Sequence, residues 1–93
     1  MNAEFTNVTP AEIKMKDAVY IMTEDIVFEN DIDKQIGEVT KVNAIVSYLE
    51  INDPYKNPNK IYKIKNKNIE EVIAIQVNDK VYKALVKKIF NKP

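Results

Sequence analysis

The sequence predicts one small, mainly β domain of the α+β class, with strands forming most of the fold and a helix at the end. A chain of 93 residues can bury a single modest core. Ile (13 residues) and Val (10) far outnumber Leu (2), and β-branched side chains fit pleated sheets better than helices. The only glycine, Gly37, stands just ahead of the most strand-like run. We expect it to serve a bent strand, through a bulge, a positive φ or the close approach of a neighbouring backbone.

The N-terminal region predicts a short helical turn followed by a strand. Thr9 is a potential cap, Pro10 suits the first helical position and Glu12 has capping-box spacing. These signals predict one helical turn over residues 10–15. Residues 18–22 then predict a strand, which apolar alternation ahead of it would also allow to begin earlier.

The middle of the chain predicts a polar connection and two more strands. Residues 23–33 hold an apolar insert, 26–28, which we interpret as a long loop or as a short strand with acidic ends. Strands are predicted at 36–42 and 44–51. In the second of these, the predicted core face consists of Ile45, Ser47, Leu49 and Ile51. Residues 52–60 are rich in Asn, Asp and Pro and predict a turn region.

The last third predicts two strands and a C-terminal helix. Residues 61–65 alternate lysine with apolar side chains, a pattern common at an exposed sheet edge. Residues 70–77 predict a strand whose Ile73, Ile75 and Val77 point one way. Apolar residues recur at helical spacing after that strand and predict an amphipathic helix over about 79–90. The alternative is a two-residue turn at 78–79 followed by a strand.

This order of elements resembles the small Src-homology-3-like β-barrels, especially the KOW-type pattern. The matching segments are KDAVYI (16–21), IGEVTKV (36–42), AIVSYLEI (44–51) and IYKIKNKNIEEV (61–72). The resemblance covers roughly residues 13–72 and implies a small antiparallel barrel. With the chain length, we expect a single domain over 1–93 whose barrel spans about 13–77. Lys16-Asp17 stands where the family usually has a Gly-Asp turn.

Charge is divided between the two halves of the chain. Residues 1–53 carry eleven acids and four lysines, a net charge of −7, and residues 54–93 carry three acids and ten lysines, a net charge of +7. Three arrangements are open. In the first, the two halves interleave and their charges pair on a solvated surface. In the second, an acidic and a basic face persist after folding, and one of them binds a charged partner. In the third, the acidic face of one copy binds the basic face of the next.

The residue inventory argues against an enzyme and against a cofactor. The chain has no His, Cys or Trp, so the usual general base, zinc ligands and thiol nucleophile are missing. Ser47 is the only serine and has no histidine to activate it. Carboxylates pair at 24–25 and 70–71, and Glu29, Asp31 and Asp33 are near one another. Their spacing lacks the sixth-position glycine of a calcium loop, so we expect no metal site.

Binding is therefore the expected function, and the preferred partner is a host protein, for example a nucleic-acid-handling enzyme with a basic cleft. The candidate contact residues are Glu24, Asp25, Glu29, Asp31, Asp33 and Glu38. The alternative is nucleic acid, bound through charge and stacking by Lys56, Lys60, Lys63, Lys65, Lys67, Tyr55 and Tyr62. The lack of Arg disfavours specific base reading. A third possibility, which the barrel resemblance implies, is a self-assembling phage head-to-tail connector component.

The expected setting is the cytoplasm, without membrane association. No basic start with an apolar stretch opens the sequence, and no apolar run approaches the roughly 20 residues that span a bilayer. The abundance of Lys, Asn and Ile indicates an AT-rich genome, such as a low-GC Gram-positive bacterium or one of its phages or mobile elements. An inhibitor of a host protein would fit such a source.

Overall fold

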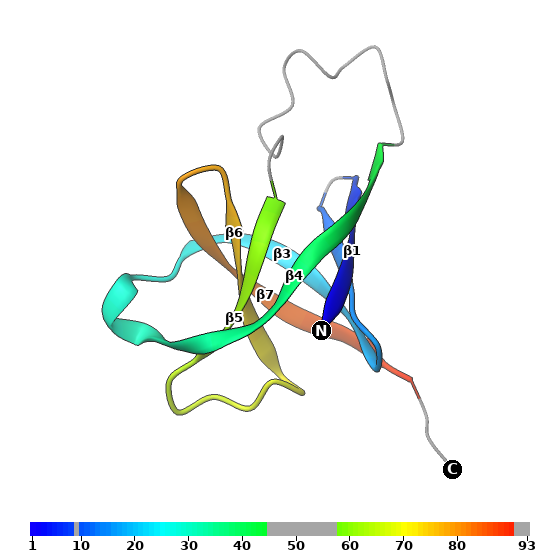
Figure 1. Cartoon of the computed structure of the whole chain (residues 1–93). Helices are drawn as coiled ribbons and strands as arrows, with labels where there is room; N and C mark the ends of the chain where they lie inside the picture. Colours follow the sequence, from blue (N-terminus) through cyan, green and yellow to red (C-terminus); the bar gives the residue numbers. More distant parts are fainter. Residues whose placement is uncertain (9, 45–57, 91–93) are drawn as a thin grey trace.

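The fold is a small closed β-barrel (Figure 1). It is seen in a computed structural model that describes residues 1–8, 10–44 and 58–90. The described elements are β1 (Asn2–Asn7), β2 (Glu12–Lys14), β3 (Ala18–Ile26), the short 3-10 helix η1 (Glu29–Asp31), β4 (Ile32–Ala44), β5 (Pro58–Ile64), β6 (Val72–Val77) and β7 (Lys80–Ile89). This confirms the mainly β class and the small barrel.

The strands follow the order β1-β2-β3-β7-β6-β5-β4 around the barrel, and β4 returns to β1. Neighbours pair antiparallel except β1 and β4, which pair in parallel and close the barrel. A closed barrel leaves no sheet edge among these strands. The prediction of an exposed edge at residues 61–65 is therefore wrong, since β5 pairs with both β4 and β6.

Two apolar clusters stabilise the barrel, one inside and one outside. The inner cluster draws buried side chains from six strands, namely Ala3, Phe5, Ile13, Tyr20, Met22, Ile61, Ile73, Ile75, Val77 and Ala84, together with Ala11, Met15 and Ala18. The outer cluster consists of Val27, Ile64, Val72 and Ala74, with Ile32, Tyr62 and Val81 packed against it. Alternate residues of β6 enter the two clusters, so that strand is buried on both faces. The predicted inward direction of Ile73, Ile75 and Val77 is confirmed.

The predicted C-terminal helix over 79–90 is wrong, and the alternative turn and strand are confirmed. Val77 pairs with Lys80 across a turn at Asn78 and Asp79, and Asn78 has a φ of 58°. Asn tolerates this left-handed conformation better than most residues. The helical spacing misled because β7 carries apolar side chains on both faces: Ala84 enters the inner cluster and Val81 the outer one.

The predicted helical turn over 10–15 is also wrong. These residues contain β2, which pairs with β1 and β3, and Thr9 lies outside the described residues. The side chains of Ala11, Ile13 and Met15 are all buried, so period-two alternation outweighs the local capping signals. The segment 23–33 is neither one long loop nor a separate strand, because β3 continues to Ile26 and η1 leads directly into β4.

Gly37 has a structural role at the place where the barrel closes. Its φ is not positive, so that part of the expectation is wrong. The β4–β5 register shifts between Gln35 and Gly37, as expected for a bulge. A Cβ at Gly37 would lie 2.5 Å from the carbonyl oxygen of Met1, which accepts a hydrogen bond from the Glu38 amide at 3.0 Å. The glycine therefore permits the close approach of β1 to β4.

The barrel is consistent with the expected Src-homology-3-like fold at the level of a small barrel. Its strands extend beyond 13–77, since β1 and β7 are both part of it. Residues 61–72 span β5, a connection and the start of β6, so they do not form one closing segment. The core face predicted for 44–51, including Ser47, lies outside the described side chains.

Candidate functional site

The candidate contact surface is a corner of the barrel where β3 turns into β4. We define residues 24–31 as the acidic corner; η1, within it, lies at the left of Figure 1, away from the barrel axis. Val27 turns inward into the outer cluster and is 7% exposed, whereas its neighbours Ile26 and Phe28 turn outward and are 41% and 70% exposed. Extended backbone produces this alternation, because successive side chains point to opposite faces.

Backbone hydrogen bonds attach the acidic corner to the barrel at several points. The Val27 amide donates to the Val81 carbonyl at 2.8 Å, and the Lys65 amide donates to the Asp31 carbonyl at 2.8 Å. Within the corner, the Asp31 amide donates to the Phe28 carbonyl at 2.8 Å. The exposed side chains are therefore presented by an anchored backbone.

Carboxylate residues flank the exposed Phe28 along the chain. Four of the predicted acidic residues lie in this corner and are exposed: Glu24, Asp25, Glu29 and Asp31. The Thr23 hydroxyl holds the start of this segment, because it accepts from the Asp25 amide at 3.2 Å and donates to the Lys83 carbonyl at 2.7 Å. The exposed Phe28 side chain therefore belongs to a segment whose charged residues are all acidic.

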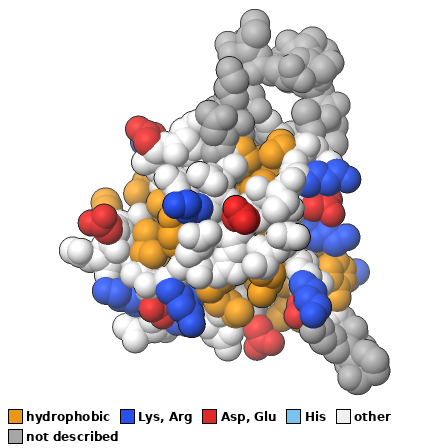
Figure 2. All heavy atoms as spheres, viewed as in Figure 1, with side chains coloured by type: hydrophobic (Ala, Val, Ile, Leu, Met, Phe, Trp, Pro, Cys, Tyr) orange, Lys and Arg blue, Asp and Glu red, His pale blue; other side chains and the backbone are white. Residues whose placement is uncertain are grey.

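The other two predicted acids lie on β4 and face the basic half of the chain. Asp33 pairs with Lys63 at 3.3 Å, and Glu38 stands opposite Lys60 in the β4–β5 register. Figure 2 shows acidic and basic side chains mixed on the viewed face. Pairing of β4 with β5 thus brings acidic and basic side chains together here. Of the six predicted acidic residues, four lie in the acidic corner, and Asp33 and Glu38 lie on β4 opposite lysines.

The predicted nucleic-acid set is brought together only in part. Lys60 and Lys63 lie on β5, and Lys65 and Lys67 follow that strand, whereas Tyr55 and Lys56 lie outside the described residues. The Tyr62 side chain packs against the outer cluster, and its hydroxyl lies 3.4 Å from Gln76 Oε1. Such a tyrosine is a packing residue and a poor stacking platform.

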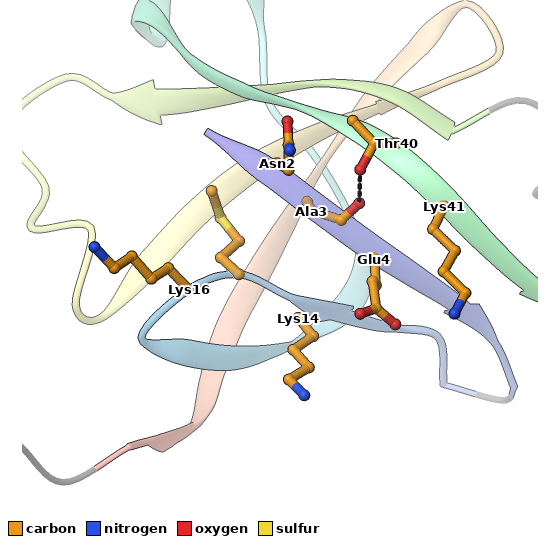
Figure 3. A pocket seen from close by; sticks show the side chains of 8 residues that line it. Asn2, Ala3, Glu4, Lys14, Lys16, Thr40 and Lys41 are labelled. Atoms are coloured by element: carbon orange, nitrogen blue, oxygen red, sulfur yellow. Dashed lines mark hydrogen bonds between the residues drawn. The ribbon is translucent and has the colours of Figure 1, made fainter.

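A second group of lysines was missed by the sequence analysis. A groove of about 300 Å³ between β1, β2 and β4 is lined by Lys14, Lys16 and Lys41 together with Glu4 (Figure 3). Figure 3 shows that Lys14 and Lys16 point in different directions and that Glu4 lies between Lys14 and Lys41. These residues come from β1, β2, β4 and the turn that follows β2, so no local charge run marks the whole group.

Two lysines of β7, Lys87 and Lys88, contact neighbouring side chains. Lys87 pairs with Glu12 at 3.0 Å. The ammonium groups of Lys14 and Lys88 lie 5.7 and 5.8 Å from the centre of the Phe90 ring, within cation–π range. The ammonium groups of Lys14, Lys87 and Lys88 therefore already have partners within the chain.

The carboxylates do not form a metal-binding group in the part of the chain that the structure describes. No three of them come together there as a metal site would require, and this includes Glu29, Asp31 and Asp33. Glu70 and Glu71 are exposed. Among the described residues, no helix is long and apolar enough to cross a membrane.

Comparison with known proteins adds no identity to this geometry. No family model, no curated protein and no solved structure matches the chain.

Proposed function

We propose that the chain is a non-enzymatic protein-binding module whose contact surface is the acidic corner. The observation that supports this is Phe28, 70% exposed, among the carboxylates of an anchored loop. Single exposed apolar residues are common on protein surfaces. An exposed aromatic residue on a hydrogen-bonded backbone is a different case. Binding energy concentrates in aromatic anchors, and a backbone already held in place loses less freedom on binding.

The carboxylates define the chemistry of the partner. Glu24, Asp25, Glu29 and Asp31 would steer a positively charged surface towards Phe28 and fix its orientation. The complementary site is an apolar socket rimmed by Lys or Arg. A basic cleft of a nucleic-acid-handling enzyme has this character, and occupation of that cleft would inhibit the enzyme.

The wider setting remains part of the proposal. A KOW-type relationship would fit a small barrel, and the Lys-, Asn- and Ile-rich composition favours a phage or mobile-element product acting in the cytoplasm of a low-GC host. Nucleic-acid binding by the lysines has less support, because Lys63 pairs with Asp33 and Tyr62 packs against the outer cluster. Assembly of copies into a larger structure is the remaining alternative.

Affinity capture from a lysate of a low-GC bacterium, with and without nuclease, tests the proposal. The wild type is compared with Phe28→Ala, with the double variant Glu24→Lys/Asp25→Lys, and with the matched control Lys65→Glu/Lys67→Glu. We expect one discrete protein to survive nuclease treatment and to be lost with both corner variants but retained by the control.

Other outcomes would contradict the proposal and indicate which alternative holds. Captured material that disappears with nuclease and with the lysine control indicates nucleic acid. Recovery of only the bait, as a salt-sensitive oligomer, indicates self-assembly. A captured protein that binds all variants equally would show that the acidic corner is not the contact surface.

A further inference from the structure

A cavity of about 250 Å³, which we call the barrel-mouth cavity, is lined by segments at the end of the barrel where the N-terminus lies (Figure 1). Its lining comes from Met1, the β2–β3 turn with the start of β3, β4 at Ile36, the connection between β5 and β6, and the end of β7. Barrel mouths are a common place for ligand sites. Its residues are distinct from those of the acidic corner.

Hydrogen bonds fix the walls of this cavity before any ligand arrives. The Tyr20 hydroxyl donates to the Ile69 carbonyl at 2.5 Å, and the Phe90 amide donates to the Asp17 carbonyl at 2.8 Å. Asn68 holds its own connection, because its side chain accepts from the Glu70 amide at 2.8 Å. A preformed site avoids the cost of ordering loops on binding.

The lining is apolar with an acidic rim. Met15, Ile36, Ile69 and Ile89 contribute apolar wall, and the charged side chains of the lining are Asp17 and Glu70, both acidic. Tyr20 belongs to the same lining and responds to both charges. Burial raises the pKa of Tyr20 above its ordinary 10.0, and the carboxylates of Glu70 and Asp17 raise it further.

Size and charge together define the ligand. The volume lies below the roughly 300–1,000 Å³ typical of drug-sized ligands, so a fragment the size of one side chain fits best. The lining holds two carboxylates, and no group of three metal-ligating side chains occurs among the described residues. The favoured cation is therefore organic, with an apolar body to cover the isoleucines.

We propose that the barrel-mouth cavity binds an alkylammonium group, with its apolar chain on Met15, Ile36, Ile69 and Ile89 and its charged nitrogen beside Asp17 and Glu70. This chemistry has two sources, a free aliphatic amine and the lysine side chain of a peptide. The site goes beyond the proposed function and does not depend on the acidic corner.

Titration of the full chain with n-pentylammonium, followed by NMR amide shifts, tests this site. We expect saturable shifts at residues of the cavity lining, with a Kd on the order of millimolar for so small a ligand. The neutral isostere n-pentanol and the anion pentanoate should bind more weakly, in that order. Binding of pentanol as tight as that of pentylammonium would overturn the charge argument.

A matched pair of variants locates the charge. Glu70→Gln removes a carboxylate of the lining, whereas Glu71→Gln removes an adjacent exposed carboxylate that does not line the cavity. We expect Glu70→Gln to weaken pentylammonium binding on the order of fivefold and Glu71→Gln to leave it unchanged. Equal effects of the two variants, or no saturable shifts with the wild type, would overturn the proposal.

A second titration, with a capped lysine amide, separates the two sources. Tighter binding of the capped lysine than of pentylammonium supports the site as a receptor for a peptide side chain. Tighter binding of pentylammonium supports a free amine as the ligand. Failure of both cations to compete for the same shifts would overturn the proposal, whatever the result at the acidic corner.

Discussion

Two short apolar runs of this chain have similar compositions and opposite surroundings. Ile73-Ala74-Ile75 lies in β6, where the inner cluster covers one face and the outer cluster covers the other. Ile26-Val27-Phe28 lies in the acidic corner, where only Val27 is covered. Hydropathy alone does not distinguish the two runs. The two runs differ in what packs against them: β6 has apolar side chains packed on both faces, whereas the corner run has them only at Val27. An apolar run that stays exposed on a hydrogen-bonded backbone is a candidate contact surface.

The largest effect should come from opening a cavity in the doubly covered strand. Ile75 is fully buried, so Ile75→Ala should lower the free energy of unfolding by about 3–4 kcal/mol. Native domains are stable by only about 5–15 kcal/mol, so the variant should be close to unfolding. Urea denaturation followed by circular dichroism measures the change. Ile26→Ala, on the exposed run, is the control and should change it by less than about 0.5 kcal/mol.

The next effect concerns the seam where β4 meets β1. Gly37→Ala places a Cβ 2.5 Å from the Met1 carbonyl oxygen, which the Glu38 amide needs as an acceptor. In an ordinary strand, replacing glycine with alanine stabilises by about 0.5–1 kcal/mol. Here we expect a loss of about 1–3 kcal/mol, because the seam must shift. Gly37→Val should cost more. A gain in thermal stability for Gly37→Ala would contradict this account of the seam.

A smaller effect should appear only at alkaline pH. Tyr20 is buried as the neutral phenol and donates to the Ile69 carbonyl. Its pKa is raised in the folded state by burial, then by Glu70 and Asp17, so its contribution is complete below pH 10 and is lost as the pH rises through the folded pKa. Tyr20→Phe should lose about 1–2 kcal/mol at neutral pH. Urea denaturation at several pH values should show that the difference in free energy of unfolding between wild type and Tyr20→Phe becomes smaller above pH 10. A difference that stays constant would contradict the raised pKa of Tyr20.

The strands were predictable from the sequence where alternation was strict and one face was buried. Residues 18–22 are of this kind, and they lie in β3. The strand predicted at 70–77 contains β6, although β6 is buried on both faces. The C-terminal strand was not predictable in this way, because β7 has apolar side chains on both faces and their combined spacing matches a helix. Closure of the barrel decided the outcome, since β7 supplies hydrogen-bond partners to both β3 and β6.

The candidate site was predictable in composition but not in arrangement. Acid enrichment between residues 24 and 38 was visible, yet only the β4–β5 register shows that Asp33 faces Lys63. The inward turn of Val27, which exposes Phe28, depends on the outer cluster and is not encoded locally. The barrel-mouth cavity joins segments far apart in the chain, so no sequence motif could mark it.

The smallest effect on stability should come from the residue most important to the proposed binding. Phe28→Ala removes a large side chain that is 70% exposed, so the free energy of unfolding should change by less than about 0.5 kcal/mol. Its neighbour Val27 is buried in the outer cluster, and Val27→Ala should cost about 2 kcal/mol. Urea denaturation of both variants measures this contrast. A loss for Phe28→Ala as large as that for Val27→Ala would mean that the ring belongs to the core, and the acidic corner would then have no aromatic anchor to offer a partner.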